Sequence, residues 1–243
     1  MNFSTGDIND INNRAVRINS TAVLLLQQNR PKDAICWLRR GLKDLASLEQ
    51  VTYESQQQDL YTHHASLKCV DYMDFEGEEG PAYSVEIPEV RDTIMSDNIF
   101  VVFNRAFHLS GYGELKTSAE STKASATLLY NMGLAWQHLG AHENNTTALK
   151  KALLAYKRAY SALSEQCNDS FSYLVMLALC NNMAHIHSFF LKLEHAKQCR
   201  DLIVEILASS SPGSSSMAAD DYAFFQSEAI LLVGQELNFA PAA

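Results

Sequence analysis

The feature that most constrains the fold is a helical hairpin that recurs three times along the chain. In residues 8–49 the apolar run ends just before Pro31, a residue that can only begin or break a helix, so two antiparallel helices joined by a tight turn are predicted. Residues 119–208 contain two further hairpins on the same plan, each with apolar residues at helical spacing. The sequence therefore predicts an all-α array of antiparallel helical hairpins.

Small residues fall at matching places in these hairpins, where two helices can approach closely. The paired positions lie twelve residues apart in the first and third hairpins and nineteen apart in the second. The difference predicts a seven-residue insertion in the second turn, at about 141–147, after a helix that ends at Gly140. The pairs are Ala22/Ala34, Gly133/Ala152 and Ala184/Ala196.

This pattern of small and large residues resembles the tetratricopeptide repeat (TPR), a two-helix unit that stacks into a solenoid. The resemblance covers about half of the chain, and it implies that the first helix of each unit lines a concave groove that binds a peptide or a partner helix. In the middle unit the pattern consists of Met132, Gly133, Trp136, Gly140, Ala152, Tyr156 and Ala159. In the first unit it consists of Ala22, Leu25, Asn29, Ala34, Leu38 and Gly41, and in the third of Met183, Ala184, His187 and Ala196.

Residues 50–118 separate the first hairpin from the other two and differ from them in character. Residues 71–97 hold nine acidic residues and one basic residue, and this net charge of −8 accounts for most of the chain's −9. The stretches 83–87 and 99–103 have strand character, so a small β-hairpin within an acidic, partly disordered insertion is expected to lie against the helices. Residues 53–98 are predicted to be the least ordered. After them, residues 209–243 predict a Ser-rich linker, a closing helix and a tail.

Charge and composition exclude several classes of protein. A net charge of −9 argues against a nucleic-acid binder, and the apolar runs are far shorter than the roughly 18 residues of a membrane span. The N-terminus lacks the pattern of a secretory signal, and the five cysteines form no C-x-x-C pair. We therefore expect an intracellular, cytoplasmic protein, with a nuclear location left open, and no membrane partner.

Motifs for catalysis and metal binding are absent from the sequence. It contains no phosphate-binding loop, no H-E-x-x-H and no G-x-S-x-G. His185 and His187 are two residues apart, which places them on different faces of a helix, and His138 and His142 would be separated by the helix end at Gly140. The sequence therefore predicts no enzyme, no cofactor and no metal.

The candidate binding residues follow from the resemblance to the TPR. In such repeats the position two before the small residue of the first helix points into the groove, which here gives Ser20, Asn131 and Asn182. An Asn amide both donates and accepts, which suits the backbone of an extended peptide, although these amides could instead only bridge adjacent helices. The further candidate positions are Asn19, Tyr130, Gln137, His138, Asn181 and His185.

These residues favour a non-catalytic protein-interaction scaffold that binds a peptide or partner helix, neutral or basic because the chain is acidic. The predicted groove positions contain no Lys or Arg, so the clamp for a terminal carboxylate found in TPR domains that bind chaperones lacks its cations. The alternative is a structural subunit of a homo- or hetero-oligomer, because the last helix is rich in apolar residues. The oligomeric state stays open. The apolar residues in question are Phe224, Phe225, Ile230, Leu231 and Leu232.

Overall fold

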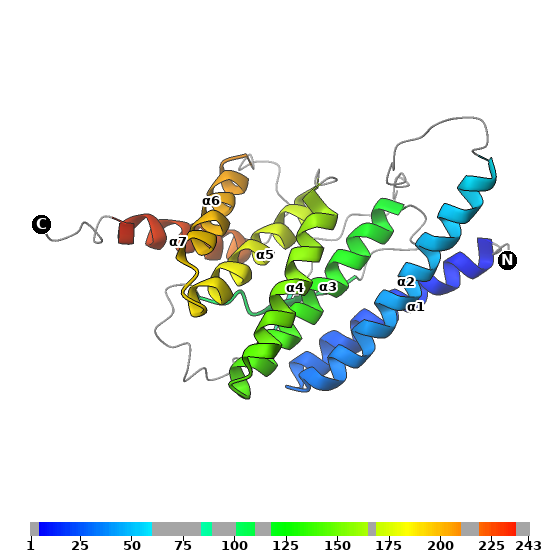
Figure 1. Ribbon diagram of the computed structural model, residues 1–243, viewed down its shortest axis with the longest axis horizontal. Coiled ribbons are helices and arrows are strands. Elements are labelled where there is room, and N and C mark those ends of the chain that lie inside the picture. Colours follow the sequence, from blue (N-terminus) through cyan, green and yellow to red (C-terminus); the bar gives the residue numbers. More distant parts are fainter. Residues whose placement is uncertain are drawn as a thin grey trace, which may run out of the picture.

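The structure is a computed structural model that describes residues 5–59, 84–88, 101–109, 118–164, 169–209 and 219–236. This part of the chain forms seven helices and one two-stranded sheet (Figure 1). The elements in chain order are α1 (Thr5–Gln27), α2 (Pro31–Asp59), β1 (Ser84–Glu86), β2 (Arg105–Phe107), α3 (Ser118–His142), α4 (Thr146–Ser164), α5 (Ser170–Phe189), α6 (Leu193–Ser209) and α7 (Ala219–Glu236).

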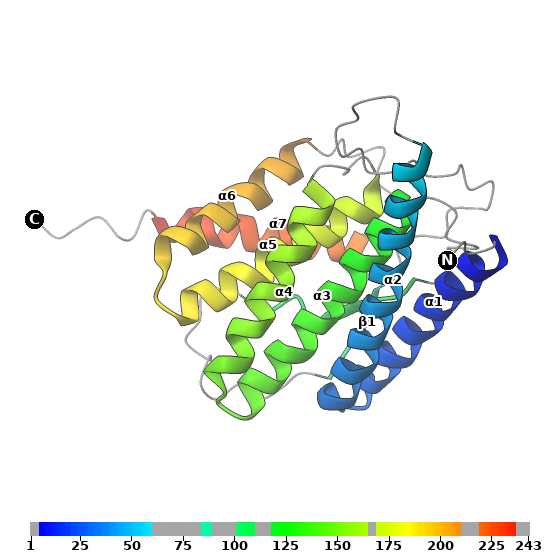
Figure 2. The same cartoon turned by 45° about the vertical axis from the view of Figure 1, so that its right-hand side comes forward.

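The first six helices pack as three antiparallel pairs set side by side. Helix α1 packs on α2, α3 on α4, and α5 on α6, while contacts of α2 with α3 and of α4 with α5 join neighbouring pairs (Figures 1 and 2). Helix α7 packs on α6 at the far end of the array. The expectation of a mostly helical array of hairpins with a small β-hairpin is confirmed at this level.

The same backbone turn closes all three hairpins. Asn29, Asn144 and Leu191 each have a positive φ, of 54°, 50° and 54°. The next residue donates its N–H to a carbonyl five residues back in each case, from Arg30 to Leu25, from Asn145 to Gly140, and from Lys192 to His187, all at 2.8 Å. This is the Schellman ending of a helix, in which a left-handed residue turns the chain and satisfies the last carbonyls.

The predicted small residues lie where the paired helices approach each other. Ala22 and Ala34 are fully buried, as is Ala184, and Ala196 is nearly so. A Cβ added to Gly133 of α3 would lie 2.4 Å from Cε1 of Tyr156 on α4, a distance that no real contact allows. These small residues therefore let the helices of each pair come close, as the sequence predicts.

The expected insertion at 141–147 and the helix end at Gly140 are both wrong. Helix α3 continues through Gly140 to His142, and α4 already begins at Thr146, so the turn is short. A Cβ on Gly140 would lie 2.6 Å from Cδ2 of Leu149, which shows why glycine stands there. The wider spacing of Gly133 and Ala152 therefore arises because both residues lie farther from the turn than their counterparts in the other pairs, and the turn itself is not longer.

The β-hairpin exists, but its second strand begins later than predicted. Ser84–Glu86 pairs antiparallel with Arg105–Phe107, whereas a strand was expected over 99–103. Phe103 is bound by helical side chains instead of a neighbouring strand, as described below. Helix α2 also extends to Asp59, past residue 49 where the first hairpin was expected to end. Most of the insertion expected to be disordered, and the Ser-rich linker, lie outside the described residues.

Candidate functional site

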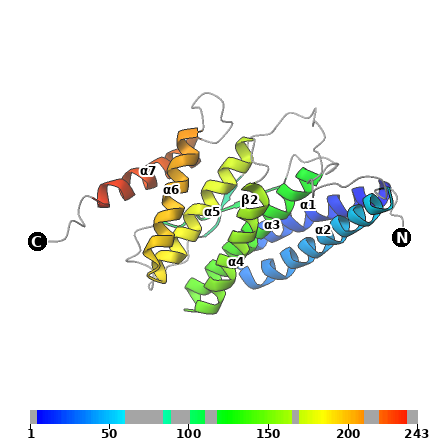
Figure 3. The same cartoon turned by 45° about the horizontal axis from the view of Figure 1, so that its top comes forward.

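Residues 101–109 run in an extended conformation across the first helices of the three hairpins. The segment contacts α1, α3 and α5, and in Figure 3 strand β2 lies between α5 and α3. One edge of the segment, formed by the backbone polar groups of the even-numbered residues, faces β1. There the N–H of Ile87 donates to the carbonyl of Asn104 at 3.2 Å. The other edge, which carries the polar groups of the odd-numbered residues, faces the helices.

Two asparagines hold the segment by its backbone. Asn182 on α5 accepts from the N–H of Phe103 at 2.9 Å and donates to its carbonyl at 3.2 Å. Asn131 on α3 does the same for Phe107, at 3.0 and 2.8 Å. Both asparagines are fully buried. Each amide thus satisfies both backbone polar groups of one residue, and the two residues held in this way are four apart.

Other buried side chains complete this ladder of contacts. Asn19 on α1 donates to the carbonyl of Phe107 at 2.9 Å, and Asn181 on α5 donates to the carbonyl of Val101 at 2.7 Å. The hydroxyl of Tyr130 lies 3.1 Å from the carbonyl of Phe103 and 3.0 Å from that of Arg105. Asn131 also donates to the side chain of Asn19 at 2.8 Å, so this amide joins α3 to α1 as well.

A second layer of polar side chains lies behind the asparagines. Asn182 donates towards the hydroxyls of Tyr130 and Tyr156, both at 3.3 Å, and Tyr156 donates to Gln137 at 2.8 Å. Gln137 in turn lies 3.2 Å from Nδ1 of His185. Because each buried group has a partner in this network, the orientation of the Asn182 amide is fixed.

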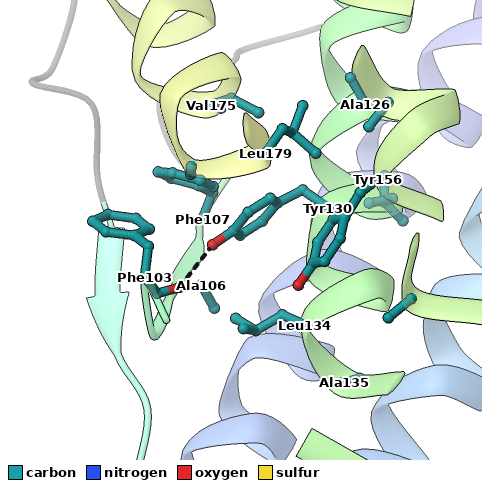
Figure 4. Close-up of a cluster of buried hydrophobic side chains, with 14 of the residues drawn as sticks. Phe103, Ala106, Phe107, Ala126, Tyr130, Leu134, Ala135, Tyr156, Val175 and Leu179 are labelled. Atoms are coloured by element: carbon teal, nitrogen blue, oxygen red, sulfur yellow. Dashed lines mark hydrogen bonds between the residues drawn. The ribbon is translucent and has the colours of Figure 1, made fainter. Parts of the chain in front are cut away.

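The phenylalanine side chains of the segment enter aromatic surroundings (Figure 4). Phe103 packs on Phe225 of α7, with ring centroids 4.8 Å apart, and on Phe224. Phe107 packs on Tyr130, also at 4.8 Å, and against the edge of Phe171. Both phenylalanines are almost completely buried, so the segment belongs to the hydrophobic core as well as to the polar ladder.

Helix α7 closes over the segment and adds two buried carboxylates. Asp221, which is fully buried, forms an ion pair with Arg105 and accepts from the hydroxyl of Ser84 at 3.1 Å. Glu228 accepts from the N–H of Val101 at 3.4 Å, and its burial raises the pKa of its carboxyl group. The segment is thus held from the side of the hairpins and from the side of α7.

Burial keeps the histidines and tyrosines around the segment neutral at pH 7. It lowers the pKa of His138 and of His185 to about 4, and it raises the pKa of Tyr130 and Tyr156 above the usual tyrosine range. His138 lies 2.6 Å from the side-chain oxygen of Asn104, so it too binds the segment. These groups serve as neutral hydrogen-bonding partners, and a base that titrates near neutral pH is not found among them.

The described residues show no group of three or more His, Cys, Asp or Glu side chains that could hold a metal ion. Burial raises the pKa of the Cys180 thiol, and it raises that of Cys199 to about 11, which disfavours the reactive thiolate. Among the same residues, no helix is both long and apolar enough to cross a membrane.

The structure brings the candidate residues named from the sequence to one place. The seven residues named at the end of this paragraph are all buried. Hydrogen bonds through Tyr156 connect Gln137 and His185 to Asn182, which touches the segment directly. In the first hairpin it is Asn19 that reaches the segment, whereas Ser20 bonds to the carbonyl of Val16 in its own helix. The seven are Tyr130, Asn131, Gln137, His138, Asn181, Asn182 and His185.

Sequence reasoning missed the acidic contribution of α7. Asp221 and Glu228 are seven residues apart, so they lie on one face of the helix, and Phe224 and Phe225 lie between them. A buried carboxylate needs a polar partner, so two acidic residues on an otherwise apolar helix face predict hydrogen-bonding or basic groups on the element that packs against it.

Comparison with protein-family models, curated proteins and solved structures gives no match. The contacts between residues 101–109 and the helices are therefore the observations from which a function can be inferred.

Proposed function

We propose that this chain is a non-catalytic, TPR-like protein-interaction scaffold whose groove binds an extended peptide by its backbone. The observation that supports this is the pair Asn131 and Asn182, each of which bonds both the N–H and the carbonyl of one residue of an extended segment. Every peptide has these backbone groups, so the ladder suits recognition of a chain in extended form.

The segment 101–109 occupies the position that a partner peptide would take. Because it is tethered within the same chain, it loses less translational freedom on docking than a separate peptide does. A partner peptide must therefore compete with it. Binding in this scheme is an exchange of one extended segment for another, with the helices in the same arrangement.

The charge of the groove favours a neutral or basic partner. Two buried carboxylates, Asp221 and Glu228, face the segment from α7, and the chain carries a net charge of −9. An acidic side chain beside Asp221 would bring two negative charges together in a site with little water, which is costly.

A labelled peptide tests this proposal. The probe is a fluorescent nonapeptide with the sequence of residues 101–109. The protein is the full chain with Phe103→Ala and Phe107→Ala, which weakens the tethered segment without substituting any helical residue. We expect the peptide to bind, as measured by fluorescence anisotropy. Adding Asn182→Ala should weaken binding by about tenfold or more, since two hydrogen bonds to the peptide backbone are lost.

Ser20→Ala is the matched control, because Ser20 bonds within its own helix and should leave the affinity unchanged. Circular dichroism checks that each variant is helical. A helical variant that binds no peptide would contradict the proposal, and an affinity that Asn182→Ala does not alter would place binding outside this groove.

A second candidate function is a structural subunit of a larger assembly. The turn between α5 and α6 exposes Leu191 by 83%, and Leu193 beside it is also exposed, although both are apolar. Sedimentation equilibrium of the wild type and of the Leu191→Ser, Leu193→Ser variant tests this candidate. A self-association that the two substitutions abolish would support it.

A further inference from the structure

Three side chains of the bound segment, Phe103, Arg105 and Phe107, enter distinct places in the groove. The ladder of amides contacts only backbone atoms, so it does not distinguish one sequence from another. Any preference for sequence must then come from what receives these side chains. The selectivity of the groove can therefore be read from their surroundings.

The outer two places accept aromatic rings. Phe103 lies among Phe224 and Phe225 of α7, and Phe107 lies against Tyr130 and Phe171. Aromatic pairs at these separations prefer tilted and edge-to-face arrangements, which are the ones present here. A smaller side chain at either place would leave a cavity in a closely packed core.

The middle place accepts a cation. Asp221 is fully buried and is paired with Arg105, whose side chain is partly exposed. A buried carboxylate that loses its cation keeps the cost of desolvation without the compensating attraction. This place therefore selects a basic side chain and rejects an acidic one.

The residue between the cation and the second ring must be small. Ala106 is fully buried where it faces Val85 of β1. A larger side chain would push β1 away from the segment or shift the backbone that Asn131 holds.

We infer that the groove recognises a partner protein through an extended peptide of the form aromatic, polar, basic, small, aromatic, which replaces residues 103–107. The polar position is that of Asn104, whose side-chain oxygen lies 2.6 Å from His138. This inference rests on the proposed function and names its ligand class. The peptide runs from the α7 end of the groove towards α1, in the direction of the chain's own segment.

The chain's own segment is an imperfect occupant, which favours exchange with a different peptide. The Oδ1 atom of Asn181 and the Nε atom of Arg105 are buried in the described part of the structure without a hydrogen-bonding partner. Val101 is 56% exposed, and the contact from its N–H to Glu228 is long at 3.4 Å. A partner peptide with a donor near Asn181 could satisfy a group that the chain leaves unpaired, whereas a second copy of this chain would repeat the same deficits.

The test uses the full chain with Phe103→Ala and Phe107→Ala and a set of labelled nonapeptides based on residues 101–109. Relative to the native sequence, we expect peptides with Phe103→Ala or Phe107→Ala to bind about a hundredfold more weakly. Peptides with Arg105→Glu or Ala106→Phe should bind at least tenfold more weakly. The readout is fluorescence anisotropy.

A protein variant tests the middle place from the other side. With Asp221→Asn added to the chain, the native peptide should bind no more than about threefold more tightly than the peptide with Arg105→Glu. The preference for the aromatic residues should persist, because Phe224 and Phe225 are unchanged. A preference for arginine that survives Asp221→Asn would overturn the assignment of Asp221.

The outcomes separate this inference from the proposed function. If all the peptides bind equally, the groove binds peptides without the preference inferred here, so the proposed function stands and this inference falls. If none binds to a helical variant, both fall. If the doubly substituted chain is not helical, Arg105→Ala replaces it and the same comparisons apply. A wild-type dimer that Phe103→Ala abolishes would identify a second copy as the occupant and overturn the inference of a different partner.

Discussion

The ring of Tyr156 on α4 lies against Gly133 on α3, so closely that a Cβ at position 133 would be 2.4 Å from Cε1 of the ring. The same placement brings the tyrosine hydroxyl within 2.8 Å of Gln137 and 3.3 Å of Asn182. The closest approach of two helices thus positions the polar layer behind the groove. Tyr156 therefore links the packing of α3 on α4 to the hydrogen bonds of the candidate site.

Gly133→Ala should lower the free energy of unfolding by roughly 1–3 kcal/mol, as overpacking does in a closely packed core. In an unhindered helix the same change would be stabilising by about 1 kcal/mol, since alanine has the better helix propensity. Urea unfolding followed by circular dichroism measures the difference. Combining it with Tyr156→Leu, which removes the ring, should recover part of the loss, and a neutral Gly133→Ala would show that the two helices do not meet there.

The arrangement of the hairpins could be predicted because its causes are local. Pro31 marks one turn, and small residues at helical spacing mark the crossings. Gly140 was misread because a glycine can end a helix or allow a neighbour to approach, and the sequence nearby is compatible with both. Only the position of Leu149 on the next helix distinguishes the two cases.

The packing of residues 101–109 on the helices could not be predicted, although the asparagines that hold this segment could. Asn131 and Asn182 follow from the resemblance to the TPR, which implies that the position two before the small residue of the first helix points into a groove. The contact between Phe103 and Asn182 joins residues 79 positions apart, and no local pattern encodes such a pairing. The strand was placed too early for the same reason, since a helix rather than a second strand binds the backbone of Phe103.

Leu191→Asn should stabilise the protein by roughly 0.5–1 kcal/mol. Leu191 has φ of 54° at the turn between α5 and α6, a conformation that costs about 1–2 kcal/mol for an ordinary residue and less for asparagine. The other two turns already have asparagine at the equivalent place, Asn29 and Asn144. Thermal unfolding measures the change in Tm.

The reverse substitution at the second turn is the matched control. Asn144→Leu places a leucine in the same backbone conformation, where φ is 50°, and should destabilise the protein by a similar amount. If both substitutions were neutral, strain at these turns would not contribute to the free energy of unfolding.

Asn131→Ala and Asn182→Ala should each lower the free energy of unfolding of the wild-type chain by roughly 1–3 kcal/mol. Each removes a buried amide, leaves the N–H of one segment residue without a partner and removes one of the donors to its carbonyl. Ser20→Ala, which affects a bond within α1, should change it much less. Urea unfolding at pH 7 compares the three variants. Equal effects would mean that the two asparagine amides contribute no more to the free energy of unfolding than the hydroxyl of Ser20 does.

Stability should fall as the pH is lowered from about 6.5 to about 4. An unfolded imidazole titrates near 6.5, but burial lowers the pKa of His138, His185 and His187 to about 4 in the folded chain. Between these values the unfolded chain binds more protons, so acid favours unfolding, and the full stability is present above about 6.5. Glu228 acts oppositely, because its raised pKa lets the folded chain hold a proton longer as the pH rises.

Urea unfolding at pH 7 and at pH 5 tests this dependence. At about 1.4 kcal/mol for each unit of pKa shift, one buried histidine contributes up to about 2 kcal/mol to the difference between the two pH values. His138→Gln and His185→Gln keep a hydrogen-bonding side chain but cannot titrate, so each should reduce that difference. His142 is exposed at the end of α3, and His142→Gln should leave it unchanged. If the first two variants kept the wild-type difference, protonation of these histidines would not be what couples pH to folding.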